Sequence, residues 1–257
     1  DRYRDFVRSH ARLRRRLRVA MDFANAMGIV EAAALEGLFD TVRLFDTLDG
    51  SFPHHEANPL KTETLETLRE TVRRERCDFG VAFDGDADRA GFVDERGEIV
   101  PMDMVTALIA AAMLERHPGA TIFYDLRSSR AVREVIEERG GRPMMSRVGH
   151  AFIKQQMRDH DAVFAGELSG HYYFRDNFYT ESSALAVVHV ANLVSAADVP
   201  LSELIRPFRR YSASGEINSR VADVHAVFER IERAYPNARF TRLDGLTVEF
   251  DDWWFNV

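Results

Sequence analysis

The sequence has little cysteine, no long apolar run and no excess of positive charge, and each shortage excludes a class of protein. Cys77 is the only cysteine in 257 residues, so no disulfide can form within the chain, which is typical of a reducing compartment such as the cytoplasm. A buried structural role is the simplest interpretation of this thiol. No apolar segment approaches the roughly 20 residues that a membrane-spanning helix needs, and no signal peptide is recognisable.

The net charge of −7 argues against general nucleic-acid binding, which depends on neutralising phosphates with Lys and Arg. One basic run, residues 12–18, is explained more simply by a solvated helix face than by a nucleic-acid patch. Hydrophobic residues make up 46% of the chain and charged residues 29%, which is ordinary for a globular protein. We therefore expect no nucleic-acid partner and no membrane partner.

The ends of the sequence differ from those of a typical complete chain. It begins without methionine in a charged, helix-like segment and stops at Trp253-Trp254-Phe255-Asn256-Val257, which reads as the middle of a strand. We therefore expect a fragment of a longer protein.

The first hundred residues alternate between helix and strand patterns. Apolar runs predict strands over 17–23, 41–45 and 78–83, and alanine-rich or amphipathic segments predict helices over 1–17, 26–38 and 62–76. A hairpin around Arg96-Gly97 follows. The loop 46–59 carries His54 and His55, which we expect to be exposed because adjacent side chains diverge. Residues 1–100 are thus predicted to form one β-α-β-α-β unit.

The same alternation repeats over residues 101–208, and residues 209–257 change to a mixed pattern with an expected strand at 214–221, a helix at 224–235 and three short strands. The predicted fold class is therefore α/β, with two consecutive mixed-sheet α/β/α units followed by an incomplete α+β domain. In such sheets, ligands bind beyond the carboxyl ends of the parallel strands.

An acidic loop follows the buried strand 78–83 and is the strongest signal in the chain. In an extended turn, Asp84, Asp86 and Asp88 point the same way and converge, and three like charges held together need a cation. Hard oxygen ligands in a short loop suit Mg²⁺. The EF-hand alternative, with Glu95 as last ligand, fails because Arg89 occupies the glycine position. A solvated acidic turn is the remaining alternative.

Two loops of the second unit place glycine and histidine after strands, at the expected ligand edge. The first is Arg147-Val148-Gly149-His150, and the second is Gly166-Glu167-Leu168-Ser169-Gly170-His171. Glu, Ser and His between glycines can bind several hydroxyls of one sugar, because glycine permits close approach of the backbone. Arg127 follows the preceding strand and could pair with an anion.

These motifs resemble those of the α-D-phosphohexomutases, and within them the bacterial phosphomannomutase/phosphoglucomutase group. The run Phe83-Asp84-Gly85-Asp86-Ala87-Asp88-Arg89 is similar to the family's magnesium loop, and Gly166 to His171 is similar to its sugar-specificity loop. The segments 147–154 and 253–257 are similar to further family segments. The resemblance implies four domains, of which residues 1–100 match the second, 101–208 the third and 209–257 the start of the fourth.

The resemblance also implies a reaction. A phosphoserine transfers its phosphoryl group to hexose 1- or 6-phosphate of mannose or glucose, a hexose 1,6-bisphosphate intermediate reorients, and the other phosphate returns to serine. Asp84, Asp86 and Asp88 would hold one Mg²⁺, and Arg89 and His171 would be catalytic. The implied substrate-binding residues are Arg127, Gly149, His150, Glu167, Leu168, Ser169, Gly170 and His171.

No Thr-Ala-Ser-His-Asn-Pro-like phosphoserine loop occurs in these 257 residues, so we expect this chain to be inactive alone. Two alternatives stay open. One is a non-catalytic module that binds metal and sugar phosphate. The other is a haloacid-dehalogenase-like phosphatase with Asp84 as nucleophile, although that motif requires Thr or Val where this chain has Asp88. A cytoplasmic location and a small-molecule sugar-phosphate partner complete the expectations.

Overall fold

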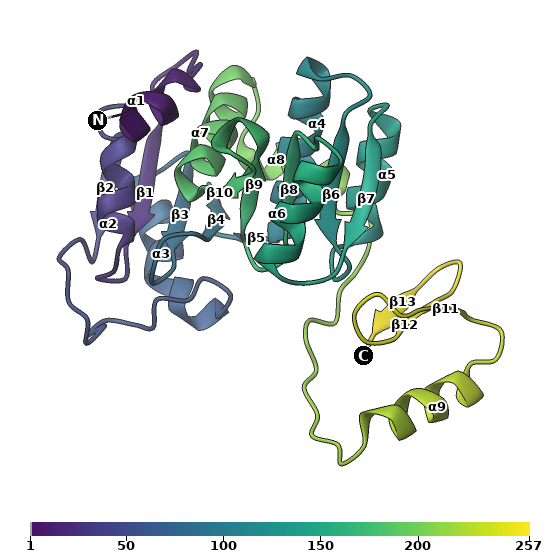
Figure 1. The fold of residues 1–257 in the computed structure, drawn as a ribbon. Helices are drawn as coiled ribbons and strands as arrows, with labels where there is room; N and C mark the ends of the chain where they lie inside the picture. The colour runs from purple at the N-terminus through teal and green to yellow at the C-terminus, as the bar shows by residue number, and fades with distance from the viewer. Residues whose placement is uncertain (1) are drawn as a thin grey trace.

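Two five-stranded sheets and one three-stranded sheet form the framework of the computed structural model, which describes residues 2–257 (Figure 1). Asp1, the first residue of the predicted unit 1–100, lies outside the described residues. The two large sheets are each covered by helices, and the small antiparallel sheet with its helix follows a linker. The predicted fold class is therefore confirmed.

The first sheet has the strand order β2-β1-β3-β4-β5, with β2, β1 and β3 parallel and β4 and β5 antiparallel. Because parallel strands end at the same edge, Asp22 at the end of β1 lies beside Ala82 of β3, two residues before Asp84. The elements of this part are α1 (Arg2–Ser9), β1 (Arg18–Asp22), α2 (Gly28–Glu31), η1 (Ala32–Ala34), β2 (Asp40–Leu44), η2 (Thr62–Leu65), α3 (Glu66–Glu75), β3 (Phe79–Phe83), β4 (Ala90–Asp94) and β5 (Ile99–Val100).

The second sheet has the order β10-β9-β8-β6-β7, with β7, β6 and β8 parallel and β9 and β10 antiparallel. Its pattern of three parallel and two antiparallel strands repeats that of the first sheet. The elements are α4 (Met102–Arg116), β6 (Thr121–Asp125), α5 (Arg130–Glu138), β7 (Arg142–Ser146), α6 (His150–Asp159), β8 (Phe164–Gly166), β9 (Tyr172–Phe174), η3 (Arg175–Asn177), β10 (Thr180–Glu181), α7 (Ser183–Ala196), α8 (Leu201–Ile205) and η4 (Arg206–Phe208).

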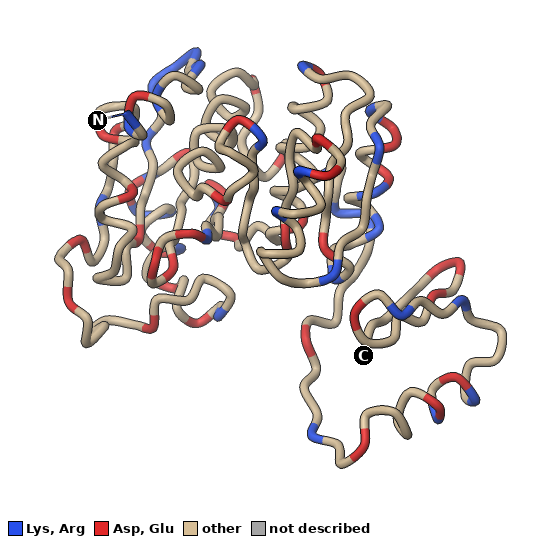
Figure 2. The backbone as a smooth tube through the Cα atoms, in the orientation of Figure 1, with Lys and Arg blue, Asp and Glu red and all other residues tan. Residues whose placement is uncertain are grey.

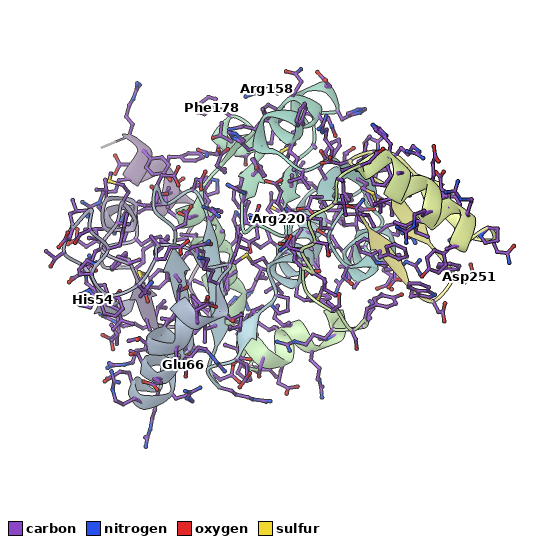
Figure 3. All side chains as sticks on the ribbon, turned by 90° about the horizontal axis from the view of Figure 1, so that it is seen from below. His54, Glu66, Arg158, Phe178, Arg220 and Asp251 are labelled. Carbon is purple, nitrogen blue, oxygen red and sulfur yellow. The ribbon has the colours of Figure 1, made fainter. Side chains whose placement is uncertain are left out.

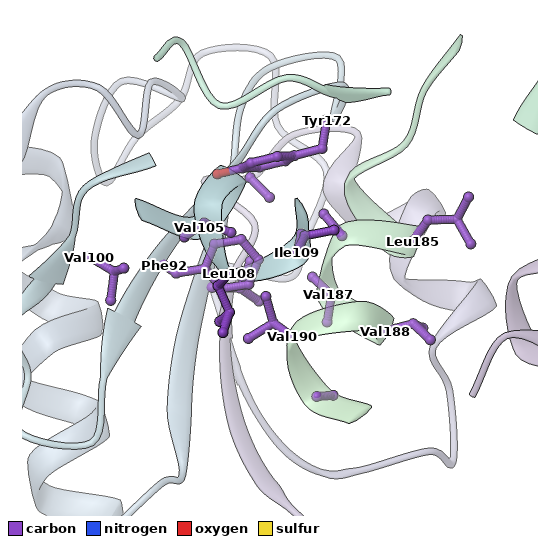
Figure 4. Packing of buried hydrophobic residues seen from close by; sticks show 14 of the residues in the cluster. Phe92, Val100, Val105, Leu108, Ile109, Tyr172, Leu185, Val187, Val188 and Val190 are labelled. Atoms are coloured by element: carbon purple, nitrogen blue, oxygen red, sulfur yellow. The ribbon is translucent and has the colours of Figure 1, made fainter. Parts of the chain in front are cut away.

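The largest core lies between the two sheets and is shared by both. Helices α4 and α7 are buried nearly all round, as expected for helices covered on every side. Their side chains pack with Phe92 of the first sheet and Tyr172 of the second (Figure 4). On the outer faces, α3 covers the first sheet and α6 the second. The two sheets are thereby joined into one body.

The third sheet, β11 (Arg239–Thr241), β12 (Thr247–Glu249) and β13 (Trp254–Asn256), is antiparallel and packs against α9 (Val224–Ala234). The predicted helix at 224–235 and the three short strands are confirmed. The predicted strand at 214–221 is wrong: the segment is exposed, and among the described residues no strand pairs with it. An alternating pattern without a partner strand does not form a ladder.

Two helix predictions in the first unit are confirmed only in part, since the helix predicted over 1–17 extends over Arg2–Ser9 alone. The alanine-rich segment 26–38 forms only two short pieces, α2 over Gly28–Glu31 and η1 over Ala32–Ala34, so tertiary context overrides alanine's propensity here. Helix α1 ends at Ser9, where Asn192 of α7 bonds the backbone of His10 and Arg12 at 2.9 and 2.6 Å. The basic run is therefore a loop and not a helix face, as Figure 2 shows between α1 and β1.

Within residues 2–257, no single helix is long and apolar enough to cross a membrane. The bent pair of Ser183–Ala196 and Leu201–Phe208, at 102° to one another, satisfies the length and composition requirements together. Most of α7 is buried in the core between the sheets, which accounts for its apolar composition.

Candidate functional site

The acidic loop begins where β3 ends, and its three carboxylates meet. One oxygen from each of Asp84, Asp86 and Asp88 lies within 4.8 Å of the other two. Asp84 is fully buried, Asp86 exposed and Asp88 half-buried, so the group opens to solvent on one side. Ala87 takes a positive φ of 66°, a left-handed conformation that turns the loop between Asp86 and Asp88.

Arg89 folds back onto the first of these carboxylates. Its backbone N–H donates to Asp84 Oδ1 at 3.1 Å and its Nε–H donates to Oδ2 at 2.6 Å. Burial raises the pKa of Asp84, and Arg89 opposes that rise through its hydrogen bonds and charge. The predicted catalytic arginine is thus held at the loop, paired with a predicted metal ligand.

The second predicted loop surrounds a buried carboxylate. Glu167 Oε1 accepts from the Gly149 N–H at 3.1 Å, and Oε2 accepts from the Tyr173 hydroxyl at 2.6 Å. The ring of His171 lies 3.2 Å from Oε2 and 2.8 Å from the Ser169 hydroxyl. Burial raises the pKa of Glu167, but the bonds from His171 and Tyr173 outweigh it and lower the pKa overall. Glu167 is therefore ionised and fixed in place.

His171 joins the two loops. Its Nε2 lies 3.3 Å from Asp88 Oδ2, while its Nδ1 faces Glu167 and Ser169. The backbone adds a bridge, because the Ala90 N–H donates to the Gly170 carbonyl at 3.1 Å. Burial lowers the pKa of His171, but the bonds to Asp88 and Glu167 raise it overall from 6.5 to about 9. The His171 ring thus lies between the acidic loop and the loop 166–171.

Arg127 lies just after β6, where the carboxylate of Asp125, the last residue of that strand, holds it in place. Asp125 accepts from the Arg127 backbone and guanidinium, both at 2.8 Å, and from the Leu168 N–H at 2.9 Å. The Nε of Arg127 is buried and has no partner among the described residues. Asp125 therefore fixes both the predicted substrate-binding residue Arg127 and the backbone of the loop 166–171 at Leu168.

His150 lies apart from this network. Its side chain is 61% exposed at the start of α6, and its ring is 3.8 Å from Glu181. Lys154, one turn further along α6, pairs with the same carboxylate at 2.9 Å. The structure therefore brings Gly149 to Glu167 but leaves the neighbouring His150 facing solvent.

Sequence reasoning missed three supporting carboxylate or phenol groups: Asp22, Asp125 and Tyr173. Asp22 and Asp125 are the last residues of β1 and β6 and are both fully buried. The signal that singled out Asp84, a carboxylate at the end of a buried parallel strand, would have found them. The expectation that His55 is exposed is wrong, because its side chain is 15% exposed and lies 3.1 Å from Asp22.

Two domain descriptions of one family match this chain. Residues 1–97 match phosphoglucomutase/phosphomannomutase alpha/beta/alpha domain II, and residues 101–211 match alpha/beta/alpha domain III. The chain belongs to the α-D-phosphohexomutase family. The resemblance seen in the sequence motifs is thus confirmed.

Individual family members agree with this assignment. The phosphomannomutase of Methanocaldococcus jannaschii is 43% identical over 93% of this chain and 54% of its own length. A crystal structure of a phosphoglucomutase/phosphomannomutase family protein from Burkholderia thailandensis, 29% identical, superimposes with a TM-score of 0.90 over 99% of this chain and 56% of that one. The chain therefore spans about half the length of these relatives.

A more distant phosphohexomutase shares the fold. N-acetylphosphoglucosamine mutase of Aspergillus fumigatus, solved with GlcNAc-6P and magnesium, is 13% identical and has a TM-score of 0.61 over 92% of this chain and 57% of that one. At this identity the likeness concerns the fold alone.

The acidic loop of this phosphohexomutase chain fits a hard divalent cation. Its donor set consists of carboxylate oxygens, which Mg²⁺ prefers over nitrogen or sulfur, and the exposed side at Asp86 leaves room for further oxygen ligands. Arg89 pairs with Asp84 and His171 faces Asp88, whereas Asp86 is exposed, so the loop keeps carboxylate charge for a cation. Glu95 does not take part, since its oxygens bond Ser202 at 2.6 and 3.1 Å.

Proposed function

We propose that the protein interconverts hexose 1-phosphate and hexose 6-phosphate, with mannose or glucose as the sugar, through an enzyme phosphoserine and a hexose 1,6-bisphosphate. Membership of the phosphohexomutase family supports this reaction. A cytoplasmic location is part of the same proposal, and the single cysteine is compatible with it.

One observation carries the proposal: His171 lies between the acidic loop, which we propose to bind the metal, and the loop 166–171, which we propose to bind the sugar. His171 reaches Asp88 on one side and Glu167 on the other, at 3.3 and 3.2 Å. A phosphoryl group beside the acidic loop is therefore within reach of a hexose bound at the second loop. Phosphoryl transfer depends mainly on such positioning and on stabilisation of charge.

The residues then take the following roles. Asp84, Asp86 and Asp88 would hold one Mg²⁺, which when bound neutralises charge on the transferring phosphoryl group. Arg89 would leave Asp84 to bind phosphoryl oxygens, and His171 would donate or accept the hydroxyl proton. Sugar and phosphate contacts are assigned to Arg127, Gly149, His150, Glu167, Leu168, Ser169 and Gly170.

The phosphoserine is assigned to a part of the protein outside residues 1–257. Within the sequence, we propose that 1–100 and 101–208 act as the metal-binding and sugar-binding domains, and that 209–257 belongs to a further α+β domain. The chain alone is then expected to bind a hexose bisphosphate in the presence of Mg²⁺ without turning over hexose phosphates.

Calorimetry with glucose 1,6-bisphosphate and Mg²⁺ tests the binding half of this proposal. Glu167→Gln should weaken binding at least about tenfold, because a buried ionised acceptor is lost. Glu115→Gln is the matched control, since that glutamate is exposed at the far end of α4.

Turnover of mannose 1-phosphate by the longer protein that contains this chain tests the catalytic half. Binding by this chain without turnover by the longer protein would favour a non-catalytic module. Phosphate captured covalently on Asp84 would favour a phosphatase. Absence of bisphosphate binding by the wild-type chain would overturn the proposal.

A further inference from the structure

His55, in the loop between β2 and η2, makes an ion pair with Asp22 at the end of β1. Its Nε2 lies 3.1 and 3.2 Å from the two carboxylate oxygens of Asp22, whose side chain is completely buried at the end of β1. Asp22 also accepts from the Ala24 N–H at 2.9 Å. A buried carboxylate needs such partners, because an unpaired buried charge is costly.

Both ring nitrogens of His55 face hydrogen-bond acceptors. One is a backbone carbonyl, and the other is the Asp22 carboxylate, which can only accept when it is ionised. Nδ1 lies 2.8 Å from the Glu56 carbonyl oxygen, and Nε2 faces the Asp22 carboxylate. A neutral imidazole carries one N–H and could satisfy only one of these acceptors. Only the doubly protonated imidazolium can donate to both acceptors at once, so this form makes the ion pair with the carboxylate.

The segment that follows His55 lies beside the acidic loop and beside β4, the strand after it. A Cβ placed on Gly85 of the acidic loop would lie 4.0 Å from the Ala57 Cβ, and one placed on Gly91 of β4 would lie 2.9 Å from the Pro59 Cβ. The turn after Asp22 also touches the metal loop, because the Met27 N–H donates to the Gly85 carbonyl at 3.2 Å. Gly85 thus lies between two segments that the His55–Asp22 pair holds together.

We propose that the His55–Asp22 ion pair is a positioning device that holds loop 45–59 against the acidic loop and so presents Asp84, Asp86 and Asp88 to the metal. This inference rests on the metal site of the proposed function. Neither residue is a ligand; both act through the backbone on either side of Gly85. Outer-shell groups that bond ligating side chains directly change metal affinity by about 10- to 100-fold when they are removed, and we expect the lower end of that range for a pair that acts through the backbone.

The other polar side chains near His55 bond elsewhere, so Asp22 is its charged partner. His54 points the other way, with Nδ1 2.7 Å from the Asn25 side-chain oxygen, and its ring stacks on Phe45. Figure 3 shows His54 at the edge of the molecule. Phe45 packs its ring edge-on against His55 and contributes no charge. Asp49 bonds Ser51 at 2.7 Å.

The pairing has a defined pH dependence. The hydrogen bond to Asp22 raises the pKa of His55 above 6.5, although partial burial opposes the rise. A group whose pKa is raised by folding stabilises the folded state fully below its unfolded pKa, and this contribution disappears as the pH rises through the folded pKa. Loop 45–59 should therefore be held most firmly in mildly acidic solution and loosen as the pH rises.

Titration of Mn²⁺ into the chain, followed by electron paramagnetic resonance, tests the proposal. His55→Ala should weaken Mn²⁺ binding about tenfold or more. His160→Ala, which removes an exposed histidine at the end of α6, should leave the affinity unchanged. Asp22→Asn, which keeps the shape of the side chain but removes the charge, should lower the pKa of His55 as followed by NMR.

Hydrogen exchange of the metal-free chain provides a readout that does not depend on metal binding. His55→Ala should speed exchange in loop 45–59 and in the acidic loop, with the core strands unchanged. Unaltered exchange and unaltered Mn²⁺ affinity in His55→Ala would overturn this inference. If Asp22→Asn fails to fold, His55→Gln repeats the test at a partly exposed position. Failure of the wild-type chain to bind Mn²⁺ would instead overturn the metal site.

Discussion

At the scale of single residues, the three carboxylates of the acidic loop differ in surroundings and therefore in what they contribute. Asp84 is buried and holds the backbone and guanidinium of Arg89. Asp88 is half-buried and lies beside His171. Burial raises the pKa of Asp88, but the hydrogen bond and charge of His171 lower it overall. Asp86 is exposed. Asp84 and Asp88 would thus combine metal binding with contacts inside the protein, whereas the exposed Asp86 would contribute metal binding alone.

Substitution of Asp86 should separate metal binding from stability. We expect Asp86→Asn to weaken Mn²⁺ binding at least about tenfold and to change the free energy of unfolding by less than about 0.5 kcal/mol, because the side chain is exposed. Asp84→Asn should lower both the affinity for Mn²⁺ and the free energy of unfolding, since Arg89 loses its charged acceptor. Calorimetry and urea unfolding measure the two quantities. Equal effects of the two substitutions on stability would contradict this division of roles.

His171 should make the stability of the metal-free chain depend on pH. Folding raises the pKa of His171 from 6.5 to about 9, so its stabilisation is complete below pH 6.5 and is lost as the pH rises to about 9. We expect His171→Gln to cost about 2 kcal/mol at the acidic end of this range and much less at the alkaline end. Urea unfolding with a chelator present measures the difference, and His160→Gln is the control. A cost independent of pH would show that His171 acts through packing alone.

At the scale of elements, the position of loop 166–171, the proposed sugar-binding loop, depends on how closely β8 approaches α4. Gly166, the last residue of β8, faces Thr106 in the middle of that helix. A Cβ on Gly166 would lie 2.1 Å from the Thr106 Oγ1 and 2.6 Å from its Cγ2. A glycine is needed at this point because it allows the strand to pass over the helix and deliver Glu167 to the site.

Substitution of Gly166 should therefore displace the strand. We expect Gly166→Ala to destabilise the chain by about 1–3 kcal/mol, the usual cost of overpacking a core, and to weaken sugar-phosphate binding. Thermal unfolding and calorimetry measure these effects. Gly50→Ala is the control, because nothing lies within 4 Å of a Cβ there. Combining Gly166→Ala with Thr106→Ala should recover part of the loss; no recovery would contradict the steric explanation.

At the scale of the whole molecule, Arg130 makes more polar contacts with the C-terminal unit than Val148, whose N–H donates to Asp244 at 3.1 Å. Arg130, at the start of α5, donates to the carbonyls of Phe250, Asp251 and Trp253 and pairs with Glu249 at 3.2 Å. Its side chain is only 12% exposed. The preceding linker is exposed and irregular, so the placement of this unit depends heavily on Arg130.

Loss of Arg130 should release the C-terminal unit without unfolding the two large sheets. We expect Arg130→Ala to weaken docking by about 2 kcal/mol, which is ~30-fold in the equilibrium, because charge-assisted bonds to carbonyls and Glu249 are lost. Limited proteolysis in the linker 211–223 measures the opening. Arg239→Ala, which removes an exposed partner of the same Glu249, is the control. Equal cleavage of the two variants would show that Arg130 is not the main contact.

Local sequence patterns predicted most strands and the longer helices, because apolar periodicity is a property of neighbouring residues. They failed where a distant contact decided the outcome. Asn192 of α7 bonds the backbone just past the end of α1, and 214–221 finds no partner strand within residues 2–257. In each case the outcome depended on contacts, made or missing among the described residues, with parts of the chain that are distant in the sequence.

The sequence by itself determined the acidic loop, the glycine-framed sugar loop, the alternation of strands and helices and, through these, the family. Only the tertiary structure decided that His171 joins Asp88 to Glu167, and that His55 lies on the buried carboxylate of Asp22. The reason is physical. Motifs follow from residues a few positions apart, whereas the charge state of a carboxylate or imidazole depends on partners that folding brings from 33 or 83 positions away.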